Sequence, residues 1–147
     1  MLSQLLATLD ALGSEKQIVV VSPENRDAIS EERPELELAV QLTPLGTGHA
    51  VMAAQESLTR FTGDVLVLFG DSPLVSIETL KAMLAARRSS ANPAVVVMGF
   101  RPENTEQYAR LILNDEGDLV RIVEHTDATD LERETDLCNS GFMAIDG

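Results

Sequence analysis

The stretch Leu45-Gly46-Thr47-Gly48-His49-Ala50 places a threonine between two glycines. Glycine lets the backbone come close to a ligand, the Thr47 hydroxyl can be exposed, and the first N–H groups of a following helix point outward. Such a segment could bind a nucleotide base or a phosphate. An ordinary turn before a helix has the same composition, and an isolated His49 is more often a packed or surface residue than a catalyst.

A second segment, Phe69-Gly70-Asp71-Ser72-Pro73-Leu74, places an acid directly after an apolar run. Ligands of open α/β sheets bind beyond the carboxyl ends of the strands, where a carboxylate can hold Mg²⁺ against phosphate oxygens. Gly70 removes side-chain bulk next to Asp71. The alternative is an Asp that ends a strand by accepting hydrogen bonds from nearby N–H groups.

The third candidate site combines Glu124, in Ile122-Val123-Glu124-His125, with Asn139, in Asn139-Ser140-Gly141-Phe142. A carboxylate can accept hydrogen bonds from sugar hydroxyls, and an amide can both donate and accept, which suits a hydroxyl or acetamido group. Glu124 could equally be a solvated residue at a strand end. Cys138 has no readable partners for nucleophilic catalysis, and one cysteine with two distant histidines disfavours zinc.

The elements that must position these residues alternate between helix and strand. Apolar spacing, caps and prolines predict helices over residues 2–12, 23–33, 47–58 and 77–88. Apolar and β-branched runs predict strands over residues 17–21, 36–41, 65–69 and 94–100. This alternation indicates an α/β fold with a mostly parallel sheet covered by helices on both faces, a three-layer α/β/α arrangement.

The alternation of helix and strand stops near Tyr108. Two strand-like runs, 109–114 and 118–124, are joined by Asp115-Glu116-Gly117 and predict a late β-hairpin. Residues 125–137 are polar, and 138–145 predict a final strand. With no repeat or linker in view, we expect one domain over residues 1–147. A parallel α/β sheet normally starts with a strand, whereas this chain starts with a helix, so we expect a partial domain whose first strand lies outside it.

The composition of the chain excludes some classes of binding partner. The 147 residues include 24 acidic and 11 basic side chains, a formal net charge of −13. This charge repels nucleic acids and anionic membranes, and no apolar run is long enough to span a bilayer. The N-terminus carries no readable targeting signal, and the one cysteine fits a reducing compartment. We therefore expect a cytoplasmic protein with no nucleic acid and no membrane partner.

Five motifs occur in an order that resembles one enzyme family. They are Gln41 with Gly46-Thr47-Gly48-His49-Ala50, Phe69-Gly70-Asp71-Ser72-Pro73-Leu74, Tyr108-Ala109-Arg110, Val123-Glu124-His125-Thr126-Asp127-Ala128 and Asn139-Ser140-Gly141. Together they resemble the N-terminal domain of bacterial bifunctional N-acetylglucosamine-1-phosphate uridyltransferase/glucosamine-1-phosphate acetyltransferase. The resemblance covers nearly the whole chain and is far more specific than any single motif.

The resemblance implies a Rossmann-like nucleotidyltransferase fold and a cytoplasmic enzyme of cell-envelope precursor synthesis, for peptidoglycan and lipopolysaccharide. It would join UTP and N-acetylglucosamine 1-phosphate to give UDP-N-acetylglucosamine and pyrophosphate, with Mg²⁺ as cofactor. By this resemblance, the uracil would be held by Gln41, Gly46 and Thr47. The nucleotide would be lined by Phe69, Gly70 and Asp71, and Asp71 would also be the catalytic metal ligand. The sugar would be held by Ala109, Glu124 and Asn139.

Several differences from the family pattern limit what the resemblance implies for this chain. Ala109 stands where the family usually has Gly, but it keeps the N–H that would contact the sugar. The family's opening strand with its Gly-rich, Arg-containing phosphate loop, a Pro-Lys segment and a later metal-binding Asn lie outside this sequence. So does the β-helix domain that performs acetyl transfer and builds the trimer.

These departures leave alternatives open. The fragment by itself is expected to be inactive, and acetyl transfer is not expected of it. A sugar-nucleotide binding module without chemistry, or a related pyrophosphorylase for another sugar or nucleotide, including the cytidylyl-transferring relatives, would carry many of the same residues.

Overall fold

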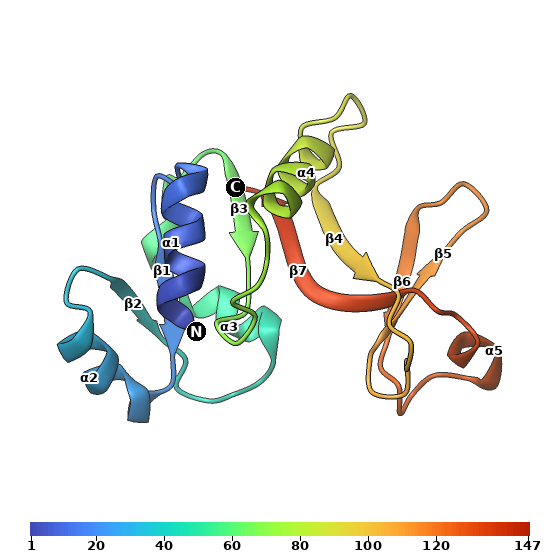
Figure 1. Ribbon diagram of the computed structural model, residues 1–147, viewed down its shortest axis with the longest axis horizontal. Coiled ribbons are helices and arrows are strands. Elements are labelled where there is room, and N and C mark those ends of the chain that lie inside the picture. The colour runs from blue at the N-terminus through green and yellow to red at the C-terminus, as the bar shows by residue number, and fades with distance from the viewer. The chain divides into compact units, whose positions relative to one another are not determined.

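The computed structural model describes residues 1–147, which cluster into two compact units (Figure 1). Unit 1 comprises Met1–Gly63, Gly70–Lys81 and Gly147, and unit 2 comprises Asp64–Phe69 and Ala82–Asp146. The expected single domain over the whole chain stays a prediction.

Unit 1 is built around a parallel strand pair. Its elements are α1 (Leu2–Leu12), β1 (Ile18–Val21), α2 (Pro23–Glu32), β2 (Glu37–Val40), α3 (Thr47–Ala53) and the 3₁₀ turn η1 (Glu56–Leu58). β1 pairs in parallel with β2, with Ile18 opposite Glu37. α1 ends at Gly13, whose φ of 82° gives the left-handed conformation that glycine adopts without a steric penalty. The helix–strand–helix–strand order confirms the α/β rhythm predicted for this stretch.

Unit 2 contains a five-stranded sheet. Its elements are β3 (Asp64–Val67), β4 (Val95–Phe100), β5 (Arg110–Leu113), β6 (Leu119–Val123), α5 (Asp130–Arg133) and β7 (Cys138–Asp146), and helix α4 (Ile77–Arg87) begins in unit 1 and ends here. Strand β7 lies between β3 and β4, since Ile145 pairs with both Val65 and Val95. Both pairings are antiparallel, so β3 and β4 run parallel to each other. Strands β5 and β6 form the predicted hairpin.

Local details refine the sequence predictions. The helix predicted over residues 47–58 ends at Ala53 and gives way to η1, which belongs to a tighter turn type. Ser22 precedes α2 but makes no side-chain capping bond, and its hydroxyl donates to Glu24 instead. Within the polar stretch 125–137 a short helix, α5, begins after Thr129. Thr129 and Glu132 form a capping box there, a signal readable from their spacing.

Strand β7 bends sharply near its middle (Figure 1). Val97 pairs with Met143 but Gly99 pairs with Asn139, so β7 carries extra residues over this interval. Such a bulge bends its strand. Gly141 lies inside it with φ of 81°, and a β-carbon there would come within 2.0 Å of the Phe69 ring. Glycine is therefore required at residue 141 by both conformation and packing.

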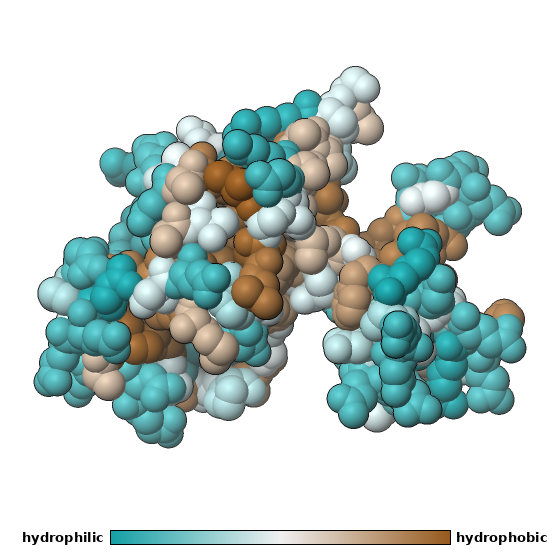
Figure 2. All heavy atoms as spheres, in the orientation of Figure 1, coloured by the Kyte–Doolittle hydropathy of each residue, from teal (hydrophilic) through white to brown (hydrophobic).

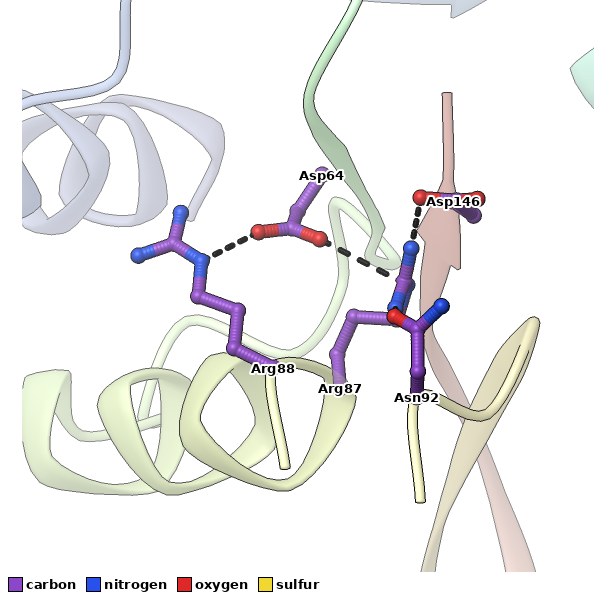
Figure 3. A network of polar contacts seen from close by, with 5 residues as sticks. All are labelled: Asp64, Arg87, Arg88, Asn92 and Asp146. Atoms are coloured by element: carbon purple, nitrogen blue, oxygen red, sulfur yellow. Dashed lines mark hydrogen bonds and ion pairs between the residues drawn. The ribbon is translucent and has the colours of Figure 1, made fainter. Parts of the chain in front are cut away.

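Charged side chains join the end of α4 to the strands of unit 2 (Figure 3). Arg87 is 4% exposed and makes ion pairs with Asp64 and Asp146, and it donates a 2.8 Å hydrogen bond to Asn92. Arg88, which is more exposed, pairs with the other oxygen of Asp64. Arg87 lies in the last turn of α4 and Arg88 directly follows it, so both suit the negative end of the helix dipole as well as their carboxylate partners.

The surface of the β5, β6 and α5 region is mostly hydrophilic on the face seen in Figure 2. Hydrophobic side chains are interspersed on this face. On the β5–β6 hairpin, Val120 is 64% exposed. The core of unit 2 is formed by apolar side chains with at most 8% exposure: Met83, Ala109, Leu111, Val123, Ala128, Cys138, Phe142 and Ala144.

No helix of the structure is both long and apolar enough to cross a membrane.

Candidate functional site

The loop between β2 and α3 is held by the side chain of Gln41. Its Nε2 donates to the carbonyl oxygen of Gly46 over 3.2 Å and lies 3.0 Å from Nδ1 of His49. Its backbone N–H donates to the Val21 carbonyl at the end of β1. Because the two amide hydrogens are used within the protein, the Oε1 atom of Gln41 is left as a hydrogen-bond acceptor. The predicted base-binding residues Gln41 and Gly46 are therefore in direct contact.

The glycines of this loop leave space beside the backbone. Gly46 has φ of 101°, and a β-carbon at Gly46 or Gly48 would meet nothing within 4 Å. Thr47 is half-buried and begins α3 without a side-chain cap. Leu42 and Leu45, at 78% and 69% exposure, flank the loop. The loop thus presents free backbone and apolar surface next to the Gln41 acceptor.

Asp71 lies in unit 1, a few residues beyond the end of β3. It is exposed, and one carboxylate oxygen accepts a 3.2 Å hydrogen bond from the Ser72 hydroxyl. Nowhere in the structure do three or more His, Cys, Asp or Glu side chains come together as a metal-binding group. Mg²⁺ in nucleotide sites is commonly held by one or two carboxylates together with substrate phosphates and water. A single exposed carboxylate fits that mode of binding and does not fit an all-protein cage.

Gly70 and Phe69, predicted with Asp71 as nucleotide-lining residues, differ in their surroundings. Gly70 is exposed in unit 1, and a β-carbon added there would meet only the Leu2 side chain, at 3.8 Å. Phe69 belongs to unit 2, where its ring packs against Gly141 and lies 6.2 Å from the ring of Phe142. Phe69 therefore supports the bend of β7, a role that the sequence did not indicate.

The three predicted sugar-binding residues lie in one row across the sheet of unit 2. Arg110 pairs with Val123 on one side and with Cys138 on the other, both in antiparallel register. The adjacent residue Ala109 therefore stands opposite both Glu124 and Asn139. The Asn139 N–H donates to the Ala109 carbonyl over 2.8 Å, which fixes the centre of this row. Residues 15 positions or more apart in the sequence thus become neighbours.

The row offers both donors and an acceptor. The Oδ1 atom of Asn139 accepts a 2.9 Å bond from the Gly141 N–H, so the amide NH₂ is left to donate. The Ala109 N–H has no hydrogen-bond partner, although the residue is only 8% exposed. Glu124 is exposed, and its carboxylate makes no intramolecular bond. Its backbone carbonyl accepts from Asp127 and Ala128, which ends β6 in a turn.

Two residues that sequence reasoning did not single out support this row. Gly141 permits the bend that follows Asn139, and a glycine inside a predicted strand was the available signal for a bulge or a close approach. Arg110 is 1% exposed beneath the row. An arginine is usually exposed, so nothing in its sequence position indicated burial.

A family model described as a MobA-like NTP transferase domain matches residues 1–122. The chain belongs to the MobA-like NTP transferase family. The nucleotidyltransferase fold predicted from the motifs is thereby confirmed, with the parallel and antiparallel strands described above.

Curated proteins are similar to this NTP transferase over all or nearly all of its length. A protein of Paramagnetospirillum magneticum called bifunctional protein GlmU is 48% identical over 147 residues, which cover 100% of this chain and 32% of that protein. Proteins of the same name from Rhodospirillum rubrum and Sphingopyxis alaskensis are 44% and 47% identical, covering 100% and 98% of this chain and 32% of each relative. The chain thus spans about a third of their length, and the resemblance to the N-terminal uridyltransferase domain is confirmed.

Solved structures agree on the fold. HddC from Yersinia pseudotuberculosis superposes on this NTP transferase with a TM-score of 0.69 and 20% identity, covering 99% of this chain and 62% of HddC. The HddC complex with GMP-PN gives the same values. At this identity the likeness concerns the fold alone.

Proposed function

We propose that this NTP transferase domain serves the transfer of a uridylyl group from UTP to N-acetylglucosamine 1-phosphate, giving UDP-N-acetylglucosamine and pyrophosphate. The observation that carries the proposal is the row Glu124–Ala109–Asn139, which combines an acceptor, a free backbone N–H and an amide donor. A sugar with hydroxyl and acetamido groups matches these donors and acceptors. The end-to-end similarity to proteins called bifunctional protein GlmU supports a sugar-nucleotidyltransferase.

The uracil would bind at the β2–α3 loop. The free Oε1 acceptor of Gln41 suits the ring N–H of uracil, and the open backbone at Gly46 and Thr47 allows the flat base to approach closely. The exposed Leu42 and Leu45 would cover part of the ring. A fixed hydrogen-bonding group gives more discrimination among bases than apolar contact does.

The reaction itself requires positioning and charge neutralisation. An oxygen of the sugar phosphate attacks the α-phosphorus of UTP, a new P–O bond forms, and the bond to the bridging oxygen breaks to release pyrophosphate. No protein nucleophile is needed, in agreement with the lack of a readable nucleophile–base pair. Asp71 would hold Mg²⁺, which neutralises phosphate charge when bound. We propose the cytoplasm as the site of this reaction and cell-envelope precursor synthesis as the use of its product.

The test is calorimetric titration of the chain with UDP-N-acetylglucosamine and with UDP, each with and without Mg²⁺. We expect tighter binding of UDP-N-acetylglucosamine, and an affinity that rises with Mg²⁺ and loses this dependence in Asp71→Asn. A pyrophosphate-release assay with UTP and N-acetylglucosamine 1-phosphate measures chemistry directly: we expect no turnover by this chain alone and turnover by a version extended at both ends, and a folded extended protein without turnover would overturn the catalytic proposal. Equal binding of cytidine and uridine nucleotides would instead favour a related pyrophosphorylase, and metal-independent binding would favour a binding module without chemistry.

The role of the row Glu124–Ala109–Asn139 in sugar binding is tested with Glu124→Gln. Glu134→Gln is the matched control. Both glutamates are exposed and neither carboxylate has an intramolecular partner, so both variants should unfold like the parent chain. Glu124→Gln is expected to weaken UDP-N-acetylglucosamine binding about tenfold, since a charged acceptor contributes more to a hydrogen bond than a neutral one. Unchanged binding in Glu124→Gln would remove Glu124 from the site.

A further inference from the structure

Arg110 is a buried cation without a carboxylate partner. It is 1% exposed and takes part in no ion pair. Its Nη1 atom donates to the carbonyl oxygens of Thr105, over 2.7 Å, and of Tyr108, and lies 3.9 Å from the sulfur of Cys138. Its Nε atom has no partner. Burying a charge on these terms is costly, and an apolar side chain of similar volume is often as stable or more so. Stability alone therefore gives no reason for an arginine here.

The two carbonyls that Arg110 binds belong to one turn. The Tyr108 N–H donates to the Thr105 carbonyl over 3.1 Å, and Arg110 contacts the first and last carbonyls of the same turn. The Tyr108 ring packs edge-on against Phe100 at 4.8 Å. The turn that leads into Ala109 is therefore held at both of its ends by one guanidinium group.

The Tyr108 carbonyl and the Ala109 N–H belong to the same peptide group. A peptide group is planar and, in the trans form found throughout this chain, its C=O and N–H point in opposite directions. A hydrogen bond from Arg110 to the carbonyl fixes the plane and thereby the direction of the N–H. A cation at the carbonyl end also polarises the group, which strengthens the N–H as a donor. Arg110 thus sets the direction of the unpaired Ala109 N–H, which lies between Glu124 and Asn139 in the row of predicted sugar-binding residues.

We propose that Arg110 is a positioning residue for sugar recognition, acting through the Tyr108–Ala109 peptide rather than by touching the ligand. The inference rests on the proposed function, since it needs the Ala109 N–H to bind the sugar. It also explains how an alanine can occupy this position: the contact depends on the backbone N–H and its orientation, which Arg110 sets, and not on the absence of a side chain.

The experiment uses Arg110→Met and Arg110→Lys, with Arg101→Met as the matched control. Arg101 is 64% exposed and pairs with an exposed carboxylate, so its loss should alter little. For each chain the affinities for UDP-N-acetylglucosamine and for UDP are measured, and their ratio reports sugar recognition alone. In Arg110→Met we expect this ratio to fall about tenfold while the affinity for UDP and the unfolding midpoint change little. Arg110→Lys, which keeps the charge but not the fork of donors, should restore part of the ratio.

A second measurement follows the Ala109 amide directly. Its ¹⁵N–¹H resonance should move in Arg110→Met without ligand, and should respond to UDP-N-acetylglucosamine but not to UDP in the parent chain. If the parent chain binds both ligands equally, the proposed function fails and this inference with it. If the parent discriminates and Arg110→Met keeps the same ratio, only the inference is overturned. If neither Arg110 variant folds, Arg110 has a purely structural role and the proposal is rejected.

Discussion

The backbone N–H of Asn139 donates a 2.8 Å hydrogen bond to the carbonyl of Ala109. This bond joins the start of β7 to the residue before β5 and places two predicted sugar ligands side by side. Two features hold it there: the turn clamped by Arg110 on the β5 side, and the bend at Gly141 on the β7 side.

Gly141→Ala is expected to lower the free energy of unfolding by about 3 kcal/mol. The new β-carbon would overlap the Phe69 ring, and overpacking and a left-handed backbone each cost on the order of 1–3 kcal/mol. The control is Gly117→Ala, which has a similar φ of 88° but nothing within 4 Å of its β-carbon, so roughly 1 kcal/mol should be lost. Urea unfolding of both variants measures the difference. Equal losses would show that the Phe69 contact contributes nothing.

Asp64→Asn is expected to destabilise the chain by about 3 kcal/mol, because it leaves the buried Arg87 with one carboxylate partner fewer. Arg88→Met removes the exposed partner of the same carboxylate, with a side chain 67% exposed, and should cost less than about 1 kcal/mol. Thermal or urea unfolding of the two variants provides the comparison. The assignment would be wrong if the exposed Arg88 proved the costlier loss.

Gln41→Ala is expected to weaken uridine nucleotide binding about tenfold, because it removes the free acceptor and releases the Gly46 carbonyl from its hydrogen bond. Gln41→Glu should also weaken it, since its carboxylate keeps an acceptor but cannot donate to the Gly46 carbonyl and would face that oxygen instead. Gln55→Ala, in the segment that follows α3, serves as control. Titration with UDP distinguishes the three variants, and parent-like affinity in Gln41→Ala would exclude Gln41 from base recognition.

The carboxyl of Glu37 should titrate below its ordinary range. A hydrogen bond from Ser57 and then one from Lys16 lower its pKa; desolvation opposes them, and the charge of Lys16 adds a smaller lowering. Because the folded-state pKa lies below the unfolded-state value, the stabilisation is complete at pH values above about 4.5 and is lost as the pH falls through the lowered pKa.

NMR titration of Glu37 in the parent chain and in Lys16→Met tests this pH dependence. The pKa of Glu37 should rise toward 4.5 in the variant. Glu35, whose pKa is lowered mainly by a hydrogen bond from Arg33, is the internal reference and should not move. A Glu37 titration that is the same in both chains would show that Lys16 has no influence on it.

The sequence by itself determined the elements and the candidate residues. Apolar periodicity and caps predicted the helices beginning at Leu2 and Ile77, because these signals are local and depend on residues within a few turns. The hairpin at Asp115-Glu116-Gly117 followed from turn chemistry in the same way. The order of the motifs along the chain predicted a nucleotide- and sugar-binding site that includes Gln41, Asp71, Glu124 and Asn139.

Only the tertiary structure decided the partners of these elements. The placement of β7 between β3 and β4, the common row of Glu124, Ala109 and Asn139, and the burial of Arg110 depend on pairings between residues far apart in the chain. Strand register is set by which side chains fill the core together, and local patterns carry no information on distant partners. The same distance explains why Phe69 supports a bend at Gly141 that neither segment reveals alone.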